Sequence, residues 1–131
     1  GDLAAVLPRC DAVILTAPAD ESTHHLIDGA ALATMKKTAV LCNVGRGSVV
    51  DETALAEALR EGRLRAAVLD VFEREPLPPE SPLWSLPGVH VSPHCSVSLD
   101  RYGEDVMALF LANLAHYVRG EPLENRVTPP D

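Results

Sequence analysis

Four short apolar runs, separated by stretches with helical spacing, constrain the fold of this chain more than any other feature. The runs cover residues 12–16, 39–43, 66–71 and 89–92 and consist mainly of alanine, valine, leucine and isoleucine. Apolar runs of this length, bounded by turn residues, predict buried strands. Strands that are apolar on both sides and alternate with helices are typical of a parallel sheet covered on both faces. The sequence therefore predicts an α/β fold with helices on both faces of a parallel sheet.

The segments between the first three runs carry helix signals. Asp28 can cap a helix that runs to Met35, because an aspartate side chain accepts hydrogen bonds from the first turn. Asp51 can cap a second helix over residues 52–61, and Gly62 lies just beyond its end, where glycine commonly closes a helix. These signals predict one helix after each of the first two strands.

The last part of the chain predicts one long helix and a tail. The helix is expected over about residues 99–119, with Ser98 as its cap and Gly120 at its end, and its apolar side chains recur at helical spacing. We therefore expect residues 1–120 to form one part of a domain and residues 121–131 to form an extended tail. The chain opens with a glycine on a segment that already resembles a helix end, so we expect it to begin inside a domain.

The composition argues against several classes of protein. Of the 131 residues, 47% are hydrophobic and 23% are charged, which indicates a folded domain rather than a disordered one. The net charge of −8 argues against nucleic-acid binding, which requires a basic surface. The apolar runs are too short to span a membrane. Three widely spaced cysteines without a CxxC pair favour free thiols in the cytoplasm over a disulfide framework.

Charged residues gather where the predicted strands end. Arg46 follows the second strand, Glu75 the third and His94 the fourth, and the carboxyl ends of parallel strands form the edge where ligands bind. An arginine grips a carboxylate through two parallel hydrogen bonds, and a histidine backed by a carboxylate exchanges a proton near neutral pH. This set suits a small 2-oxo or 2-hydroxy acid, with a nicotinamide cofactor as redox partner. Gly45 and Gly47 are expected to turn the chain and let it approach the cofactor ring.

One alternative remains open at this edge, and a metal site is not expected. Glu73 lies two residues from Glu75, and spacing alone does not decide which of them supports the histidine. The adjacent His24 and His25 lack a third ligand at a suitable spacing, so we expect no metal site.

Three stretches, NVGRGSVVDETAL, LDVFEREPL and VSPHCS, resemble in order and spacing the D-isomer-specific 2-hydroxyacid dehydrogenases. The resemblance runs from about Leu3 to Val127, and PLPPESPLW is most similar to the glyoxylate/hydroxypyruvate reductases of that family. It implies the C-terminal half of a Rossmann-like domain that binds NAD or NADP. It also implies a full-length homodimer that transfers a hydride between this cofactor and a small D-2-hydroxy acid or 2-oxo acid, such as hydroxypyruvate or glyoxylate. The last helix would cross toward a substrate domain outside this chain.

The resemblance assigns roles to individual residues. Arg46 would bind the substrate carboxylate, His94 would donate the proton, Glu75 would support the histidine and Asp70 would contact the nicotinamide carboxamide. Besides Arg46, Asp70 and His94, the implied cofactor contacts are Ala17, Pro18, Val44, Gly45, Ser96 and Val97. Cys95 and Ser96 stand where the family more often has small apolar residues. The family's glycine-rich phosphate loop has no counterpart in the chain.

Three functional hypotheses follow. The first is a reductase, of which this chain is a part. The second is a non-catalytic NAD-sensing module of the corepressor type. The third is an inactive fragment, because half of the family's sheet would leave the strand at residues 12–16 without a neighbour, and a bare strand edge favours association.

Overall fold

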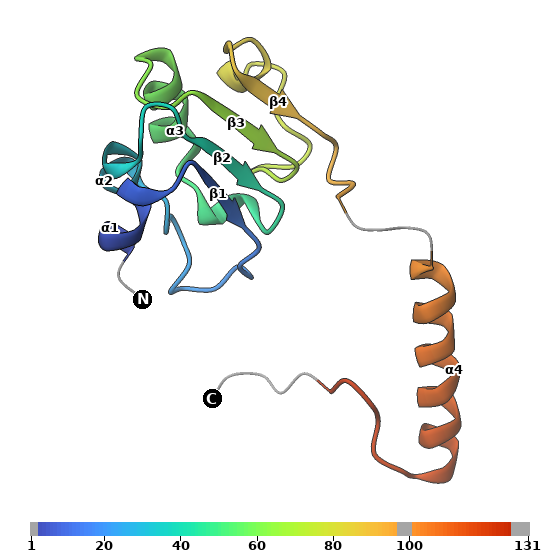
Figure 1. Cartoon of the computed structure of the whole chain (residues 1–131). Helices are drawn as coiled ribbons and strands as arrows, with labels where there is room; N and C mark the ends of the chain where they lie inside the picture. Colours follow the sequence, from blue (N-terminus) through green and yellow to red (C-terminus); the bar gives the residue numbers. More distant parts are fainter. Residues whose placement is uncertain (1–2, 97–100, 127–131) are drawn as a thin grey trace. The chain divides into compact units, whose positions relative to one another are not determined.

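The computed structural model describes residues 3–96 and 101–126 (Figure 1). The chain divides into two compact units, one of residues 1–96 and one of residues 97–131. The first unit contains the sheet and the candidate site, and the second contains one long helix. Each unit is described separately.

The first unit is built on a four-stranded parallel sheet with the order β1-β2-β3-β4. Its register places the last residues of the strands in one row, so all four carboxyl ends lie at the same edge. This arrangement confirms the α/β prediction, with each strand somewhat shorter than its apolar run. The strands are β1 (Ala12–Leu15), β2 (Val40–Asn43), β3 (Ala66–Leu69) and β4 (Val89–Val91).

Short helices connect the strands, and their caps are the predicted ones. The Asp28 side chain accepts a hydrogen bond from the Ala31 amide at 2.8 Å, and Asp51 accepts one from Ala54 at 2.9 Å. Each such cap stabilises its helix by about 1 kcal/mol. The helical elements of this unit are α1 (Leu3–Val6), η1 (Leu7–Arg9), α2 (Gly29–Thr34), η2 (Gly47–Val49), α3 (Glu52–Arg60) and η3 (Pro82–Trp84).

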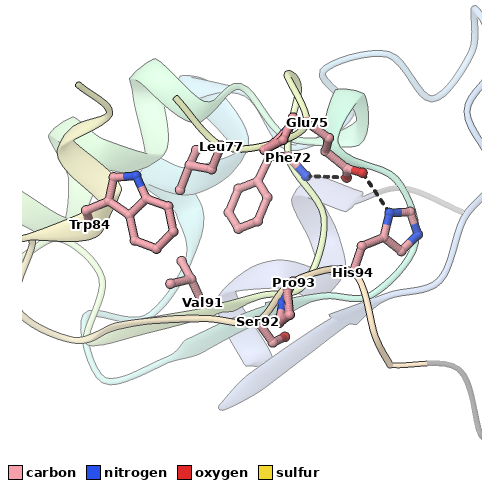
Figure 2. Close-up of a pocket in the computed structure, with 9 residues that line it drawn as sticks. Phe72, Glu75, Leu77, Trp84, Val91, Ser92, Pro93 and His94 are labelled. Carbon is pink, nitrogen blue, oxygen red and sulfur yellow. Dashed lines mark hydrogen bonds and ion pairs between the residues drawn. The ribbon is translucent and has the colours of Figure 1, made fainter. Parts of the chain in front are cut away.

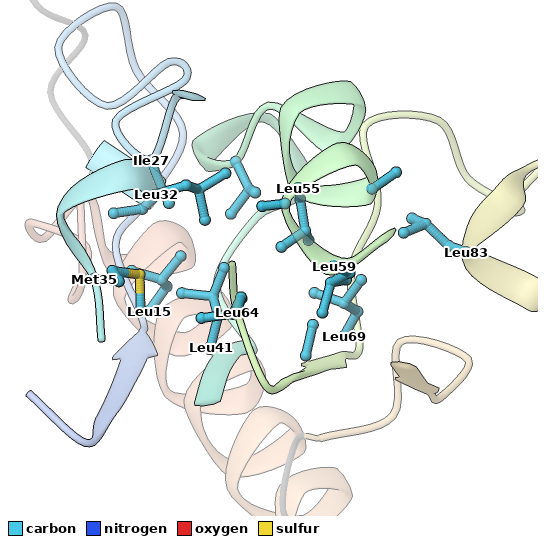
Figure 3. Packing of buried hydrophobic residues seen from close by; sticks show 14 of the residues in the cluster. Leu15, Ile27, Leu32, Met35, Leu41, Leu55, Leu59, Leu64, Leu69 and Leu83 are labelled. Carbon is cyan, nitrogen blue, oxygen red and sulfur yellow. The ribbon is translucent and has the colours of Figure 1, made fainter. Parts of the chain in front are cut away.

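The hydrophobic core lies between α2, α3 and one face of the sheet (Figure 3). Leu41 and Leu69 project from the strands, and Leu32 and Leu55 come from the helices; all four are at most 2% exposed. Burying a leucine side chain contributes roughly 1.5–3 kcal/mol, so this layer fixes the strands and the turns that follow them.

The opposite face of the sheet is largely open. Ile14, Cys42, Val68 and His90 are register neighbours on this face, and Ile14 is 66% and Val68 37% exposed. Parallel sheets are normally covered on both faces. Residues 3–96 supply the predicted helices on one face only, so the second layer expected from the sequence lies outside this described segment.

The second unit consists of α4 (Tyr102–Arg119) and the segment after it. Gly120 closes the helix in a left-handed conformation with φ of +69°, as predicted. Asn113 exchanges two hydrogen bonds with the Glu124 backbone, which folds the following segment back along the helix. None of the side chains of α4 is buried. The predicted cap Ser98 and the start of the predicted helix lie outside the described residues. Within those residues, no helix is both long and apolar enough to span a membrane.

Candidate functional site

The turns after the strands continue the hydrogen bonding of the sheet. The Val44 amide donates to the Leu15 carbonyl oxygen at 3.1 Å, and the Ser92 amide donates to that of Leu69 at 2.9 Å. These bonds tie the turn after β2 to β1 and the turn after β4 to β3. The candidate residues therefore sit on short turns that the sheet holds in place.

Asn43, the last residue of β2, shapes the turn that carries Arg46. Its buried side chain accepts a hydrogen bond from the Gly45 amide at 3.1 Å and donates one to the Arg46 carbonyl oxygen at 2.9 Å. The Arg46 side chain is exposed, and its Nη1 donates to the Gly45 carbonyl oxygen at 2.7 Å. The role of Asn43 was not predicted from the sequence. The signal that could have indicated it is a polar amide residue directly after an apolar run.

The two glycines around Arg46 are explained by neighbouring backbone. A Cβ at Gly45 would lie 2.7 Å from the Ala17 carbonyl oxygen, and one at Gly47 would overlap the backbone of Phe72. Neither glycine has a positive φ, so the backbone conformation itself does not require glycine. Close packing therefore explains these glycines, in addition to the approach to a cofactor ring expected from the sequence. The arginine turn is packed between the ends of β1 and β3, and side chains at 45 and 47 would push it away from both.

His94 and Glu75 form a hydrogen-bonded pair on the next two turns (Figure 2). The distance from His94 Nδ1 to Glu75 Oε2 is 2.7 Å, and the Phe72 amide donates to Glu75 Oε1 at 3.0 Å. The bond to His94 lowers the pKa of Glu75; partial burial opposes this effect, and the Phe72 amide adds to it. An ionised Glu75 accepts a hydrogen bond from the Nδ1–H group, which leaves Nε2 as the nitrogen that can exchange a proton.

Glu73 has different partners, so the geometry distinguishes it from Glu75. Its amide donates to Glu52 Oε1 at 2.6 Å, and its Oε1 accepts a hydrogen bond from the Glu52 amide at 3.0 Å. Its Oε1 also lies 3.2 Å from His25 Nε2. Of the two glutamates, Glu75 is the one that contacts His94.

Asp70 anchors the turn that carries His94. Its carboxylate is only 1% exposed and accepts hydrogen bonds from the Ser92 hydroxyl and from the Cys95 and Ser96 amides, the latter two both at 2.9 Å. Burial raises the pKa of Asp70, but these three hydrogen bonds outweigh it and hold the pKa well below its usual value. The geometry gives Asp70 a role that the sequence analysis did not assign, as the ionised support of the histidine turn.

The turn that carries Arg46 and the turn that carries His94 lie at the same edge of the sheet. Each of them contacts the segment after β3. On one side, Gly47 packs against the Phe72 backbone; on the other, the Phe72 amide holds the glutamate that binds His94. Residues from three successive strand ends are thus connected by direct contacts. Such an edge can bind a small anion and exchange a proton with it.

Comparison with known proteins agrees with this geometry. Residues 1–96 match the family described as D-isomer specific 2-hydroxyacid dehydrogenase, NAD binding domain. The chain belongs to this family. It is 45% identical over 128 residues to glyoxylate/hydroxypyruvate reductase B from Pectobacterium atrosepticum, and equally similar to the same protein from Citrobacter koseri. The alignments cover 98% of the chain and 40% of each relative, so the chain spans about 40% of the length of these relatives.

Solved structures of family members show the same fold. A family protein from Aeromonas salmonicida is 40% identical with a TM-score of 0.88, over 96% of this chain and 40% of that one. A dehydrogenase from Xanthobacter autotrophicus, in complex with NADPH and MES, is 39% identical with a TM-score of 0.84, over 97% of this chain and 52% of that one. An NADPH-dependent glyoxylate/hydroxypyruvate reductase from Sinorhizobium meliloti, in complex with NADP and sulfate, is 35% identical with a TM-score of 0.83, over 95% and 40%.

In this dehydrogenase domain, the other predicted cofactor residues lie along the same edge. Ala17 and Pro18 follow β1, and the backbone of Ala17 lies against Gly45. Val44 follows β2 and is half-buried, whereas Ser96 is exposed and binds Asp70 through its amide. Val97 lies outside the described residues. No group of three metal-ligating side chains occurs among residues 3–96 and 101–126.

An apolar pocket of about 670 Å³ lies next to the hydrogen-bonded pair formed by His94 and Glu75. This pocket was not predicted from the sequence, because much of its wall comes from the proline-rich stretch of residues 72–84, in which no regular spacing marks the lining residues. Figure 2 shows Phe72 and Leu77 between the Trp84 ring and the Glu75 carboxylate. The pocket residues are Phe72, Glu75, Pro76, Leu77, Trp84, Val91, Ser92, Pro93 and His94.

Proposed function

We propose that this chain is the C-terminal cofactor-binding part of a reductase that acts on small 2-oxo acids such as hydroxypyruvate or glyoxylate. The observation that carries the proposal is the 2.7 Å contact between His94 and Glu75, at the sheet edge that also holds Arg46. Relatives named glyoxylate/hydroxypyruvate reductase, and a neighbour in complex with NADP, support an enzyme over the NAD-sensing corepressor alternative.

The residues have complementary chemical roles in reduction. The Arg46 guanidinium binds the substrate carboxylate and fixes the orientation of C2. The ionised Glu75 keeps the Nδ1 proton in place, so His94 delivers its proton from Nε2 to the carbonyl oxygen. A reduced nicotinamide held at this edge would supply the hydride for C2 and would be oxidised in return, and His94 recovers its proton from solvent. The product is a 2-hydroxy acid, and the reverse reaction uses the same groups.

The sheet edge fits a nicotinamide cofactor, NAD or NADP. Pro18, exposed, and Ala17 and Val44, half-buried, offer small apolar surfaces there, and the buried Gly45 adds no side chain above them. Ser96 would complete the edge beside the histidine, and Val97, outside the described residues, stays a predicted cofactor contact. A direct contact between Asp70 and the carboxamide stays a prediction, since the buried carboxylate already accepts three hydrogen bonds.

Further features of the full-length protein belong to the same proposal. A chain that spans about 40% of its relatives leaves room for a substrate domain and for the first half of the cofactor domain. Coverage of the open sheet face by this first half accounts for the exposed Ile14 and Val68. We propose a homodimer in the cytoplasm, with α4 crossing from the domain of residues 1–120 toward the substrate domain, and no activity for the 131 residues alone.

Replacement of Arg46 tests the carboxylate role. We expect Arg46→Gln in the full-length protein to lower kcat/KM for hydroxypyruvate about a hundredfold. Hydrogen bonds to charged groups contribute roughly 1.5–3 kcal/mol each, and about 1.4 kcal/mol corresponds to a factor of ten. The assay follows NADH and NADPH absorbance, and Arg60→Gln at the exposed end of α3 is the matched control. An unchanged kcat/KM would exclude the carboxylate role of Arg46. If the wild-type protein reduced neither hydroxypyruvate nor glyoxylate with NADH or NADPH, the proposed reductase activity would be excluded.

A further inference from the structure

Three segments that are distant in sequence meet at the Glu73 side chain. The Glu73 side chain accepts a hydrogen bond from the Glu52 amide at 3.0 Å, and the Glu52 side chain accepts one from the Glu73 amide at 2.6 Å. These two bonds join the start of α3 to the segment after β3. His25, from the loop between β1 and α2, contacts the same Glu73 oxygen at 3.2 Å. None of these contacts involves a residue to which the proposed reaction assigns a role.

His25 also contacts the turn that carries Arg46. Its amide donates to the Ser48 carbonyl oxygen at 2.8 Å, two residues after Arg46. Its φ is +48°, a left-handed conformation that is unfavourable for a residue with a side chain. The chain keeps this conformation, and in it the backbone of His25 binds the arginine turn while the imidazole binds Glu73.

Glu73 in turn controls the amide that positions Glu75. Phe72, its direct neighbour, donates its amide to Glu75 Oε1 at 3.0 Å, and Glu75 Oε2 binds His94. The backbone of Phe72 is also the surface against which Gly47 packs. A shift of Glu73 therefore moves both the support of His94 and the wall of the arginine turn.

Two carboxylates, those of Glu52 and Glu73, lie together at this junction. Burial raises the pKa of Glu52, and the negative charges of Glu73 and Glu75 raise it further, against the lowering effect of the Glu73 amide. The carboxylates of Glu52 and Glu73 are held together by their hydrogen bonds to backbone, although they repel each other. The His25 imidazole lies 3.2 Å from the Glu73 carboxylate, on the side of the arginine turn.

We propose that His25 and Glu73 are positioning residues that hold the Glu75 segment against the Arg46 turn, so that Arg46 and His94 act on the same substrate molecule. The inference rests on the proposed function for its effect on turnover. Its structural part, that the contact between His25 and Glu73 keeps Glu75 on His94, is independent of any activity.

Paired variants separate the contact from the fold. His25→Leu removes the polar group that contacts Glu73, whereas His25→Gln keeps a polar group at a similar reach. Glu73→Gln removes the charge of the acceptor, and Glu57→Gln makes the same change at an exposed position on α3. We expect His25→Leu and Glu73→Gln to disturb the site, and His25→Gln and Glu57→Gln to leave it close to wild type.

The first readout is the tautomer of His94 in the 131-residue chain, measured by ¹⁵N NMR of labelled histidine at alkaline pH. Wild type is expected to carry its proton on Nδ1, because Glu75 accepts it there. His25→Leu and Glu73→Gln should shift His94 toward a mixture of tautomers, and His94→Gln identifies the signals. A His94 that keeps the Nδ1 proton in both variants would overturn the proposal, whatever their effect on thermal stability.

The second readout is steady-state kinetics of the full-length protein. His25→Leu should lower kcat about tenfold and change KM much less, since misplacement of a reacting group by about 1 Å can cost a hundredfold. His25→Gln should restore most of the lost turnover. Failure of the reductase proposal would appear as an inactive wild type and leave the tautomer result valid. Normal turnover in His25→Leu would contradict the positioning role.

Discussion

His94→Gln in the full-length protein is expected to lower kcat for hydroxypyruvate reduction by about 10²–10⁴-fold, the usual contribution of a general acid. Glutamine can hydrogen-bond the carbonyl oxygen of the substrate but has no proton to give it. KM should change much less, because Arg46 still binds the carboxylate. Stopped-flow or steady-state absorbance of the reduced cofactor measures the loss.

Two further variants make the His94 result specific. Glu75→Gln keeps a side chain of the same shape but removes the charge that orients Nδ1, so we expect a smaller loss of kcat than for His94→Gln. His90→Gln makes the same substitution at an exposed position on β4 and should retain wild-type turnover. Equal turnover in His94→Gln and His90→Gln would refute the assignment of His94 as proton donor.

Asp70→Ala is expected to lower the free energy of unfolding by about 3–5 kcal/mol, because it removes three hydrogen bonds to a charged group and each such bond contributes roughly 1.5–3 kcal/mol. The substitution leaves the Ser92 hydroxyl and the Cys95 and Ser96 amides without the carboxylate that binds them. Urea denaturation followed by Trp84 fluorescence measures the change in the sheet unit. Asp11→Ala, at a side chain that is 84% exposed, should cost less than about 1 kcal/mol.

The same carboxylate gives the stability a defined dependence on pH. The pKa of Asp70 is lower in the folded chain than its ordinary value of about 3.9 in an unfolded one. Its contribution is therefore complete above about pH 4 and is lost as the pH falls toward the folded-state pKa. Glu75, whose pKa is also lowered, adds to the loss with the same sign. Wild type should lose stability below about pH 4 more steeply than Asp70→Ala; equal slopes would show that Asp70 is not held ionised.

The fold was predictable because its signals are local. Each apolar run became a strand, and the aspartates at positions 28 and 51 cap helices where their spacing to the next apolar residues predicted. The parallel order followed from the alternation of strands with helices. Strand ends were less accurate: Asp70 was included in the third strand but lies just beyond β3, where its side chain turns to the loop after β4.

The site was predictable in its residue types but not in its supports. Arg46 and His94 were predicted because strand ends share one edge of a parallel sheet, whereas the choice of Glu75 over Glu73 came from the family resemblance. The contacts of Glu73 with Glu52 and of Asp70 with Cys95 join residues 21 and 25 positions apart, and no periodicity marks them. The need for glycine at position 47 arises from the backbone of Phe72, again a contact between separate turns.

Isotope transfer is the most direct test of the proposed chemistry. The full-length protein is incubated with hydroxypyruvate and a reduced nicotinamide that carries deuterium at both C4 positions, and the product is examined by NMR and mass spectrometry. The expected product is glyceric acid of the D configuration with the deuterium at C2. Cofactor oxidation without deuterium in the product, or product of the L configuration, would contradict it.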